Sequence, residues 1–291
     1  MLPLRDENPT RRTPIVTLAI IGVCLWLYFA WQPSLGQPGI VRVDTPDGIL
    51  EFDEATAFTL ENAAIPCEIV NLRPLTVDEV VSTFSGPIQP EACDAGSPDS
   101  APVFPQKSVW LSVLTSMFLH GSIAHLGGNL LFLWIFGNNI EDHMGHVRYL
   151  IFYLLGGVVA TGAHVILNLD STIPMVGASG AIAAVMGAYL VWFPNAPVRT
   201  AVFFFFITLV DIRAKWLLGF WFISQFFTSP NSGVAWAAHV GGFVFGVIIG
   251  LMVRASGGLR RATWTPDYRA IDRWDTTGGI GYGPYARRRG Y

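Results

Sequence analysis

Residues 234–253 read VAWAAHVGGFVFGVIIGLMV and contain no Asp, Glu, Lys or Arg. A helix of about twenty such residues is long enough to cross the ~30 Å hydrocarbon core of a bilayer. Residues 15–31 form a second uncharged stretch near the N-terminus. Of all 291 residues, 52% are hydrophobic and 13% are charged, whereas ordinary soluble domains carry about 25% charged residues. The sequence therefore predicts a polytopic membrane protein and excludes a water-soluble globular chain or a disordered one.

The pattern of apolar stretches predicts an all-α membrane protein with six transmembrane helices. The fifth helix is the least clear, because Asp211, Arg213 and Lys215 would be costly at the centre of a bilayer. We therefore expect residues 200–210 to lie at the membrane interface and the fifth helix to begin near Ile212. The six predicted spans are residues 14–31, 116–137, 148–168, 177–193, 212–228 and 234–254.

The distribution of basic residues orients the chain. Fifteen of the 18 Lys and Arg residues fall in the N-terminal tip (1–13), in the segments that follow the second and fourth spans, or at Arg254 and in the C-terminal tail (255–291). Because basic loops are retained in the cytoplasm, we expect a multi-pass protein of the cell membrane with both termini cytoplasmic. The first span is expected to stay uncleaved, since Ala30-Trp31-Gln32 is a poor signal-peptidase site.

The long first loop, residues 32–108, contains many Pro, Gly and Asp residues. We expect it to form a small, partly ordered extracytoplasmic appendage with one possible short helix over residues 76–83. A disulfide between Cys67 and Cys93 is possible if this loop faces an oxidising compartment, and the sequence leaves that question open. The basic tail is rich in glycine and is expected to be flexible.

Four polar residues in the predicted spans indicate a candidate site: His125, Asn129, Ser179 and His239. Polar side chains are costly inside a membrane and often serve a function there. His239 lies about six residues, or ~9 Å, from the outer end of its span. Each of the other three also falls in the outer part of its span. We therefore expect all four to lie in one layer within about 10 Å of the outer surface.

Two of the spans carry a small residue at every fourth position, a pattern that lets helix backbones approach closely in a membrane. Ser179 adjoins the first small residue of the fourth span, and His239 adjoins the first one of the sixth. We expect these stripes to pack together and to bring the hydroxyl and the imidazole close to each other. The stripes are Gly180, Ala184 and Ala188 in the fourth span, and Ala238, Gly242, Gly246 and Gly250 in the sixth.

A serine beside a histidine base is an arrangement for nucleophilic catalysis, because an unpaired hydroxyl is a weak nucleophile at neutral pH. Acyl transfer also needs hydrogen-bond donors for the developing oxyanion. The Asn129 amide, the His125 ring and the backbone N–H groups of Ser179 and Gly180 can supply them. No Asp or Glu in the spans is placed to orient His239, so a dyad is predicted instead of a triad.

The motifs that contain these residues resemble those of the rhomboid intramembrane serine proteases. By this resemblance, which covers residues 110–254, Ser179 is the nucleophile, His239 is the base, and His125 and Asn129 are oxyanion-hole side chains. It also implies a six-transmembrane-helix rhomboid-like bundle, with Gly180 and His120 supporting the site and a catalytic core over residues 109–254. The motifs are MFLH at 117–120 with HLGGN at 125–129, GASG at 177–180, and AHVGGFVFG at 238–246.

One position departs from this resemblance. Some bacterial rhomboids have a tyrosine four residues after the serine, where it stacks on the histidine. This chain has Ala183 at that position. We therefore expect another group, Trp236 or Phe243, to hold the imidazole of His239.

The resemblance implies a serine endopeptidase that cleaves transmembrane segments of other proteins near the extracytoplasmic boundary. Water must reach Ser179, so we expect a polar cavity on that side lined by His120, His125 and Asn129. No cofactor or metal is implied. The expected partners are transmembrane substrates and the lipid bilayer, without nucleic acid, and the oligomeric state stays open.

Three other classes of function are disfavoured by the sequence. A catalytically inactive relative that binds membrane clients is disfavoured by the intact Ser179 and His239. A small transporter would be expected to show charged residues inside the spans or paired broken helices. A metalloprotease would need an H-E-x-x-H motif, which is absent from the sequence, and His143 and His146 are expected to lie in a solvated turn.

Overall fold

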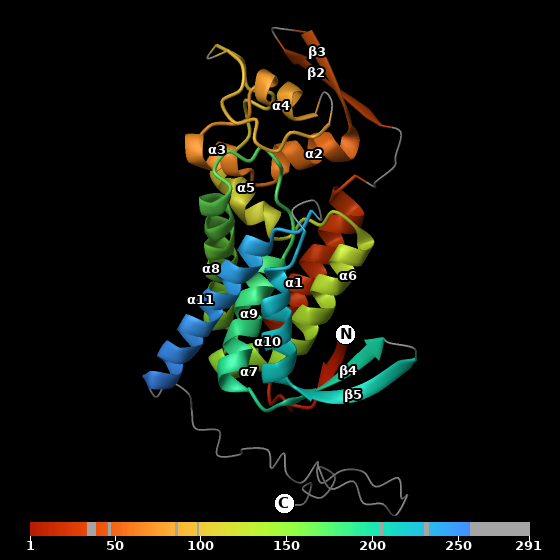
Figure 1. Cartoon of the computed structure of the whole chain (residues 1–291), viewed down its shortest axis with the longest axis vertical. Coiled ribbons are helices and arrows are strands. Elements are labelled where there is room, and N and C mark those ends of the chain that lie inside the picture. The colour runs from red at the N-terminus through yellow and green to blue at the C-terminus, as the bar shows by residue number, and fades with distance from the viewer. Residues whose placement is uncertain are drawn as a thin grey trace, which may run out of the picture. The chain divides into compact units, whose positions relative to one another are not determined.

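Helices dominate the computed structural model of the chain (Figure 1). It describes residues 1–33, 39–45, 48–84, 87–97, 99–203, 206–229 and 233–256. The tail that was predicted to be flexible and cytoplasmic lies outside the described residues from position 257 onward. Among the described residues, two helices are long and apolar enough to cross a membrane: α8 (His146–Leu167) and α11 (Trp236–Ala255).

Shorter helices complete the bundle. Their outer faces, like those of α8 and α11, expose large apolar side chains such as Leu155, Phe220 and Ile248, as expected for helices that contact lipid. Two of the shorter helices, α1 and α6, continue through a π-helical turn, η1 and η2. The shorter helices are α1 (Ile15–Trp26) with η1 (Leu27–Trp31), α6 (Ile123–Phe132) with η2 (Leu133–Gly137) and α7 (Asn138–Met144), α9 (Ser179–Trp192), and α10 (Ala214–Gln225).

Helix α9 lies at the centre of these helices. Every residue from 180 to 189 is buried, and α8 and α11 run alongside it (Figure 1). The close approach of α11 depends on small residues. A Cβ atom added at Gly242 would overlap the carbonyl oxygen of Gly180, and one added at Gly246 would overlap that of Ala184. The predicted packing of the two small-residue stripes is confirmed.

The second predicted span begins later than expected, at Ile123 instead of residue 116. Residues before the break form a separate helix, α5 (Val109–Ser116). Helix α6 starts where the Ser122 hydroxyl accepts a hydrogen bond from the backbone N–H of His125 at 3.1 Å. The hydropathy pattern hides this break because the intervening loop begins with apolar residues.

The prediction of an all-α fold is wrong, because parts of the chain pair as antiparallel strands. β1 (Leu2–Asp6), β4 (Pro197–Phe203) and β5 (Ile207–Arg213) form a sheet in the order β1-β4-β5. β-branched residues are frequent in β4 and β5 and favour strands, while Arg199 and Asp211 form a cross-strand ion pair at 3.0 Å. The β4–β5 hairpin extends across the helix ends (Figure 1), and α10 begins directly after it, two residues beyond the predicted Ile212.

The long first loop is more ordered than predicted. The expected short helix over residues 76–83 is confirmed as α4 (Val77–Phe84). The appendage has its own apolar core, which includes Leu60, Ile65, Leu75 and Val80. The other elements of this appendage are a hairpin of β2 (Ile40–Thr45) and β3 (Gly48–Asp53), followed by α2 (Glu54–Asn62) and α3 (Pro66–Asn71).

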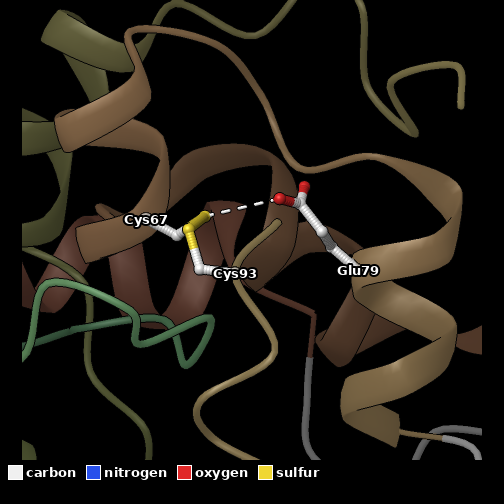
Figure 2. A group of neighbouring side chains, drawn as sticks. All are labelled: Cys67, Glu79 and Cys93. Atoms are coloured by element: carbon white, nitrogen blue, oxygen red, sulfur yellow. Dashed lines mark hydrogen bonds between the residues drawn. A yellow bond between two sulfur atoms is a disulfide. The ribbon is translucent and has the colours of Figure 1, made fainter. Parts of the chain in front are cut away.

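Cys67 of α3 and Cys93 form a disulfide within this appendage. Figure 2 shows Glu79 of α4 pointing at the disulfide, with its Oε1 3.6 Å from Cys67 Sγ. Glu79 is fully buried and accepts hydrogen bonds from Arg73 at 2.8 Å and from the backbone N–H of Thr76 at 2.7 Å. Burial raises the pKa of this carboxyl group, but the hydrogen bonds outweigh burial and hold the pKa below its usual value.

Removing the disulfide is expected to destabilise the appendage. The disulfide closes a loop with a sequence separation of 26 residues, and loop-closure entropy then contributes about 3.5 kcal/mol. Replacing Cys67 and Cys93 together by serine should lower the free energy of unfolding of the appendage by roughly that amount. Denaturant-dependent proteolysis within residues 39–106 measures the loss.

Reductant provides the matched control for this variant. It should bring the wild-type protein to the stability of the double-serine variant and leave the variant unchanged. Equal denaturation midpoints for untreated wild type and variant would show that the disulfide does not stabilise the appendage.

Candidate active site

The side chains of Ser179 and His239 meet although they lie 60 residues apart in the sequence. Ser179 is the first residue of α9, and His239 lies in the first turn of α11. The His239 Nε2 atom is 2.7 Å from Ser179 Oγ, within hydrogen-bond distance. The close contact between Gly180, which directly follows Ser179, and Gly242, about one turn after His239, brings these two helix ends together.

Gly177 forms the turn that leads into α9. Its φ angle is +129°, a conformation that favours glycine. A Cβ atom at this position would lie 2.8 Å from Cε1 and Nε2 of His125 and 3.6 Å from Ser179 Oγ. Gly177 therefore permits both the turn and the close approach of the His125 ring to the serine.

Two other predicted site residues, His125 and His120, lie at this point. His125 lies against Gly177, and the ring of His120 packs edge-on against His125 with centroids 5.2 Å apart. Asn129 follows His125 by one turn of α6, so the two side chains share a helix face. The Asn129 Nδ2 atom is buried without a hydrogen-bond partner among the described residues. The Gly180 backbone N–H, in the first turn of α9, has no acceptor within its own helix.

Two residues of α10 contact His239, and the sequence analysis missed both. The His239 Nδ1 atom is 2.7 Å from Oε1 of Gln225. The Trp221 ring lies over the imidazole, with centroids 5.7 Å apart and planes tilted by 39°. The two residues are four positions apart, one turn of α10, and this spacing is the signal that could have indicated them.

The expectation that Trp236 or Phe243 holds the imidazole is corrected by these contacts. Trp236 packs against Phe226 instead. Phe243 packs against Trp221 with centroids 6.0 Å apart, so it supports the ring that contacts His239. The sequence could not indicate these contacts, because they depend on how closely α10 packs against α11.

Comparison with known proteins gives the family. A model described as the Rhomboid domain matches residues 107–256, half of the chain. The chain belongs to the rhomboid family.

Several curated proteins are similar to this rhomboid. They include "Rhomboid protease GluP" of Bacillus subtilis, 41% identical over 81 residues, which cover 28% of this chain and 15% of the relative. "Rhomboid protein 1, mitochondrial" of Saccharomyces cerevisiae is 28% identical over 48% of this chain and 41% of its own. The human "Rhomboid-related protein 3" is 30% identical over 50% of this chain and 36% of its own length. The matches thus span less than half of each relative.

The appendage of this rhomboid holds the segment that leads to Ser179. The backbone N–H of Met175 donates to the carbonyl of Ala64 at 2.8 Å, and that of Thr172 donates to Pro90 at 2.8 Å. In the opposite direction, the N–H of Cys67 donates to the carbonyl of Ser171 at 2.9 Å. Residues 171–175 are therefore fixed by backbone hydrogen bonds to the appendage shortly before Gly177 turns into α9.

His120 is fixed by the end of the first helix. The side-chain amide of Gln32 donates to the backbone carbonyl of His120 at 3.1 Å and accepts from its N–H at 3.0 Å. The His120 Nδ1 atom lies 3.1 Å from the carbonyl of Phe118. The loop between α5 and α6 is thereby held in place beside His125.

Metal-ligating side chains cluster at one place in the described part of this rhomboid, around Cys67, Glu79 and Cys93. The disulfide occupies both sulfur atoms, so this group is not a set of free thiolate ligands. His143 and His146 do not form a pair. His146 lies 2.6 Å from Glu141, whereas His143 packs against aromatic rings at the end of α9.

Proposed function

We propose that this rhomboid is an intramembrane serine endopeptidase that cleaves transmembrane segments of other membrane proteins near their extracytoplasmic boundary. The observation that carries the proposal is the 2.7 Å contact between Ser179 Oγ and His239 Nε2 at the start of two closely packed apolar helices. A hydroxyl paired with an imidazole is a nucleophile with its general base. Membership in the rhomboid family, with a relative named as a protease, adds support.

In the proposed reaction, Ser179 Oγ attacks the carbonyl carbon of the scissile peptide bond while His239 Nε2 takes the hydroxyl proton. The resulting oxyanion accepts hydrogen bonds from the Asn129 amide, the His125 ring and the N–H of Gly180. His239 then gives its proton to the leaving amine as the C–N bond breaks. A water molecule, deprotonated by His239, hydrolyses the acyl-enzyme and releases Ser179.

We infer that six helical segments cross the membrane: α1 with η1, α6 with η2 and α7, α8, α9, α10 and α11. Helix α9 has 14 residues and rises only about 21 Å, less than the ~30 Å hydrocarbon core. If its far end reaches the opposite interface, Ser179 lies below the membrane surface. A substrate helix must then unwind locally to expose its peptide carbonyl, so helix-breaking or small residues are expected near the cut.

We infer the orientation from two independent features. A disulfide in the appendage favours an oxidising, extracytoplasmic compartment. The basic residues are concentrated in the N-terminal segment, in the segments that follow the second and fourth spans, and in the C-terminal tail. This distribution favours a cytoplasmic location for those segments. Both features support an orientation in which the appendage, and the helix starts that carry Ser179 and His239, face the outside and both termini lie in the cytoplasm.

The experiment that tests this function uses purified full-length protein in liposomes together with a single-span membrane protein. We expect two products, and mass spectrometry should place the cut within the outer part of the substrate's transmembrane segment. The Ser179→Ala variant should give none. A wild-type protein that retains the substrate on affinity capture but leaves it uncut would contradict the protease assignment and indicate a client-binding rhomboid.

Replacing Asn129 by alanine is expected to lower kcat by roughly tenfold to a thousandfold, the range for loss of one oxyanion donor. Since Nδ2 of Asn129 has no partner among the described residues, the substitution removes no internal hydrogen bond of that atom. The thermal midpoint should therefore change little. Initial rates at saturating substrate measure the effect.

Asn168→Ala is the matched control for the oxyanion prediction. Asn168 lies at the end of α8, where its amide donates to the carbonyl of His164 at 2.9 Å. This variant should retain the wild-type kcat. If Asn129→Ala also retains it, Asn129 has a structural role and the oxyanion is held by other donors.

A further inference from the structure

Gln225 lies in the last turn of α10 and is 7% exposed. Its side-chain amide bridges the backbone of α10 and the imidazole of His239. Oε1 is 2.7 Å from His239 Nδ1, while Nε2 is 3.0 Å from the carbonyl oxygen of Trp221 and 3.3 Å from the hydroxyl of Ser224. A buried amide with partners at both ends holds a defined orientation.

The contacts decide which end of the amide faces His239. A backbone carbonyl oxygen can only accept hydrogen bonds, so the group facing Trp221 O must be the amide nitrogen. Oε1 is then left to face the imidazole, and it can only accept. His239 Nδ1 must therefore carry the hydrogen, which leaves the Nε2 lone pair directed at Ser179 Oγ. This is the tautomer in which the histidine can take the serine proton.

From this geometry we propose that Gln225 is a positioning residue that fixes the tautomer and ring orientation of His239, as the third member of a hydrogen-bonded chain Ser179–His239–Gln225. The proposal rests on the proposed protease function. In water-exposed serine hydrolases a carboxylate serves this purpose. In an apolar bundle a neutral amide fixes the same tautomer without the cost of burying a charge.

Trp221 complements Gln225 from the same helix. When His239 takes the serine proton, the imidazole becomes a cation. The amide oxygen of Gln225 then accepts a hydrogen bond from a charged donor, which strengthens that bond. The Trp221 ring at 5.7 Å adds attraction between its face and the cation. Together these residues replace the stacked tyrosine whose position is Ala183 here.

Gln225→Met tests the proposal because it removes the acceptor with little change in side-chain volume. We expect kcat to fall about tenfold to a hundredfold, the scale of losing one hydrogen bond to a group that becomes charged. KM should stay at the wild-type value, since Gln225 does not touch the substrate, whereas the loss of the buried amide's hydrogen bonds should lower the thermal midpoint modestly. Gln225→Glu keeps an acceptor oxygen toward Nδ1 and should retain kcat within about threefold of the wild type.

Ile223→Met provides the matched control. It introduces the same side chain two residues away, on an exposed position of α10, and should leave kcat, KM and the thermal midpoint unchanged. A wild-type kcat in Gln225→Met, or no recovery in Gln225→Glu with the fold intact, would overturn the role of Gln225.

A second readout does not depend on catalysis. Nitrogen-15 NMR of labelled histidine should show His239 protonated at Nδ1 in the wild type and a mixture of tautomers in Gln225→Met. Wild-type protein with the proton on Nε2 would overturn the proposal even if the enzyme is active. Conversely, a wild type that cleaves no substrate but shows the Nδ1–H tautomer would contradict the protease function and leave the positioning role supported.

Discussion

Ser179→Ala and His239→Ala are each expected to reduce cleavage of a transmembrane substrate by on the order of 10⁴-fold or more, to the background level. Without the hydroxyl no acyl-enzyme forms, and without the imidazole the hydroxyl keeps its proton. The double variant should be no slower than either single one, because residues that act as a unit are not additive. Initial rates in liposomes measure all three variants against the wild type.

Ser256→Ala is the control for these variants. Ser256 directly follows α11, and its hydroxyl donates to the carbonyl of Val253 at 3.0 Å, at the opposite end of the helix from His239. This variant should cleave at the wild-type rate. Substantial cleavage by Ser179→Ala would exclude a serine mechanism at this site, and independent, additive losses in the double variant would exclude a dyad.

Gly242→Leu is expected to reduce activity by on the order of 10²-fold, far more than it reduces stability. Gly242 contacts the carbonyl of Gly180 with no room for a Cβ atom, and Gly246 contacts that of Ala184 in the same way. Overpacking of this kind typically costs ~1–3 kcal/mol. Pushing α11 away from α9 by about an angstrom also separates His239 from Ser179, and a misplacement of that size can cost on the order of 10²-fold in rate.

Val244→Leu is the matched control for the glycine variant. Val244 is exposed on α11, two residues from Gly242 and on the other side of the helix. The Val244→Leu substitution should change neither the cleavage rate nor the thermal midpoint appreciably. A fully active Gly242→Leu protein would show that the contact between the stripes does not set the Ser179–His239 distance.

The core of the site could be predicted from the sequence because its determinants are local patterns. Small residues repeat every four positions beside Ser179 and beside His239, and helix geometry alone converts that repeat into a contact. The prediction that the polar residues share one depth came from counting positions along each span.

Other features escaped prediction because they depend on tertiary contacts. Gln225 is an uncharged residue near the end of a short apolar helix, and only the packing of α10 against α11 brings it to His239. Residues 200–210 contain no charged residue, and hydropathy indicated an interfacial segment there but could not show that β4 and β5 pair as a hairpin. The Cys67–Cys93 disulfide depends on how the appendage folds.

The most direct test of the account is covalent labelling of the wild-type protein with a fluorophosphonate, followed by peptide mass spectrometry. The reagent phosphonylates a serine hydroxyl that a neighbouring base activates. We predict a single adduct on Ser179, with none formed in His239→Ala. An adduct on a different serine, or continued cleavage of substrate by protein whose Ser179 is fully modified, would contradict the assignment of Ser179 and His239 as the catalytic pair.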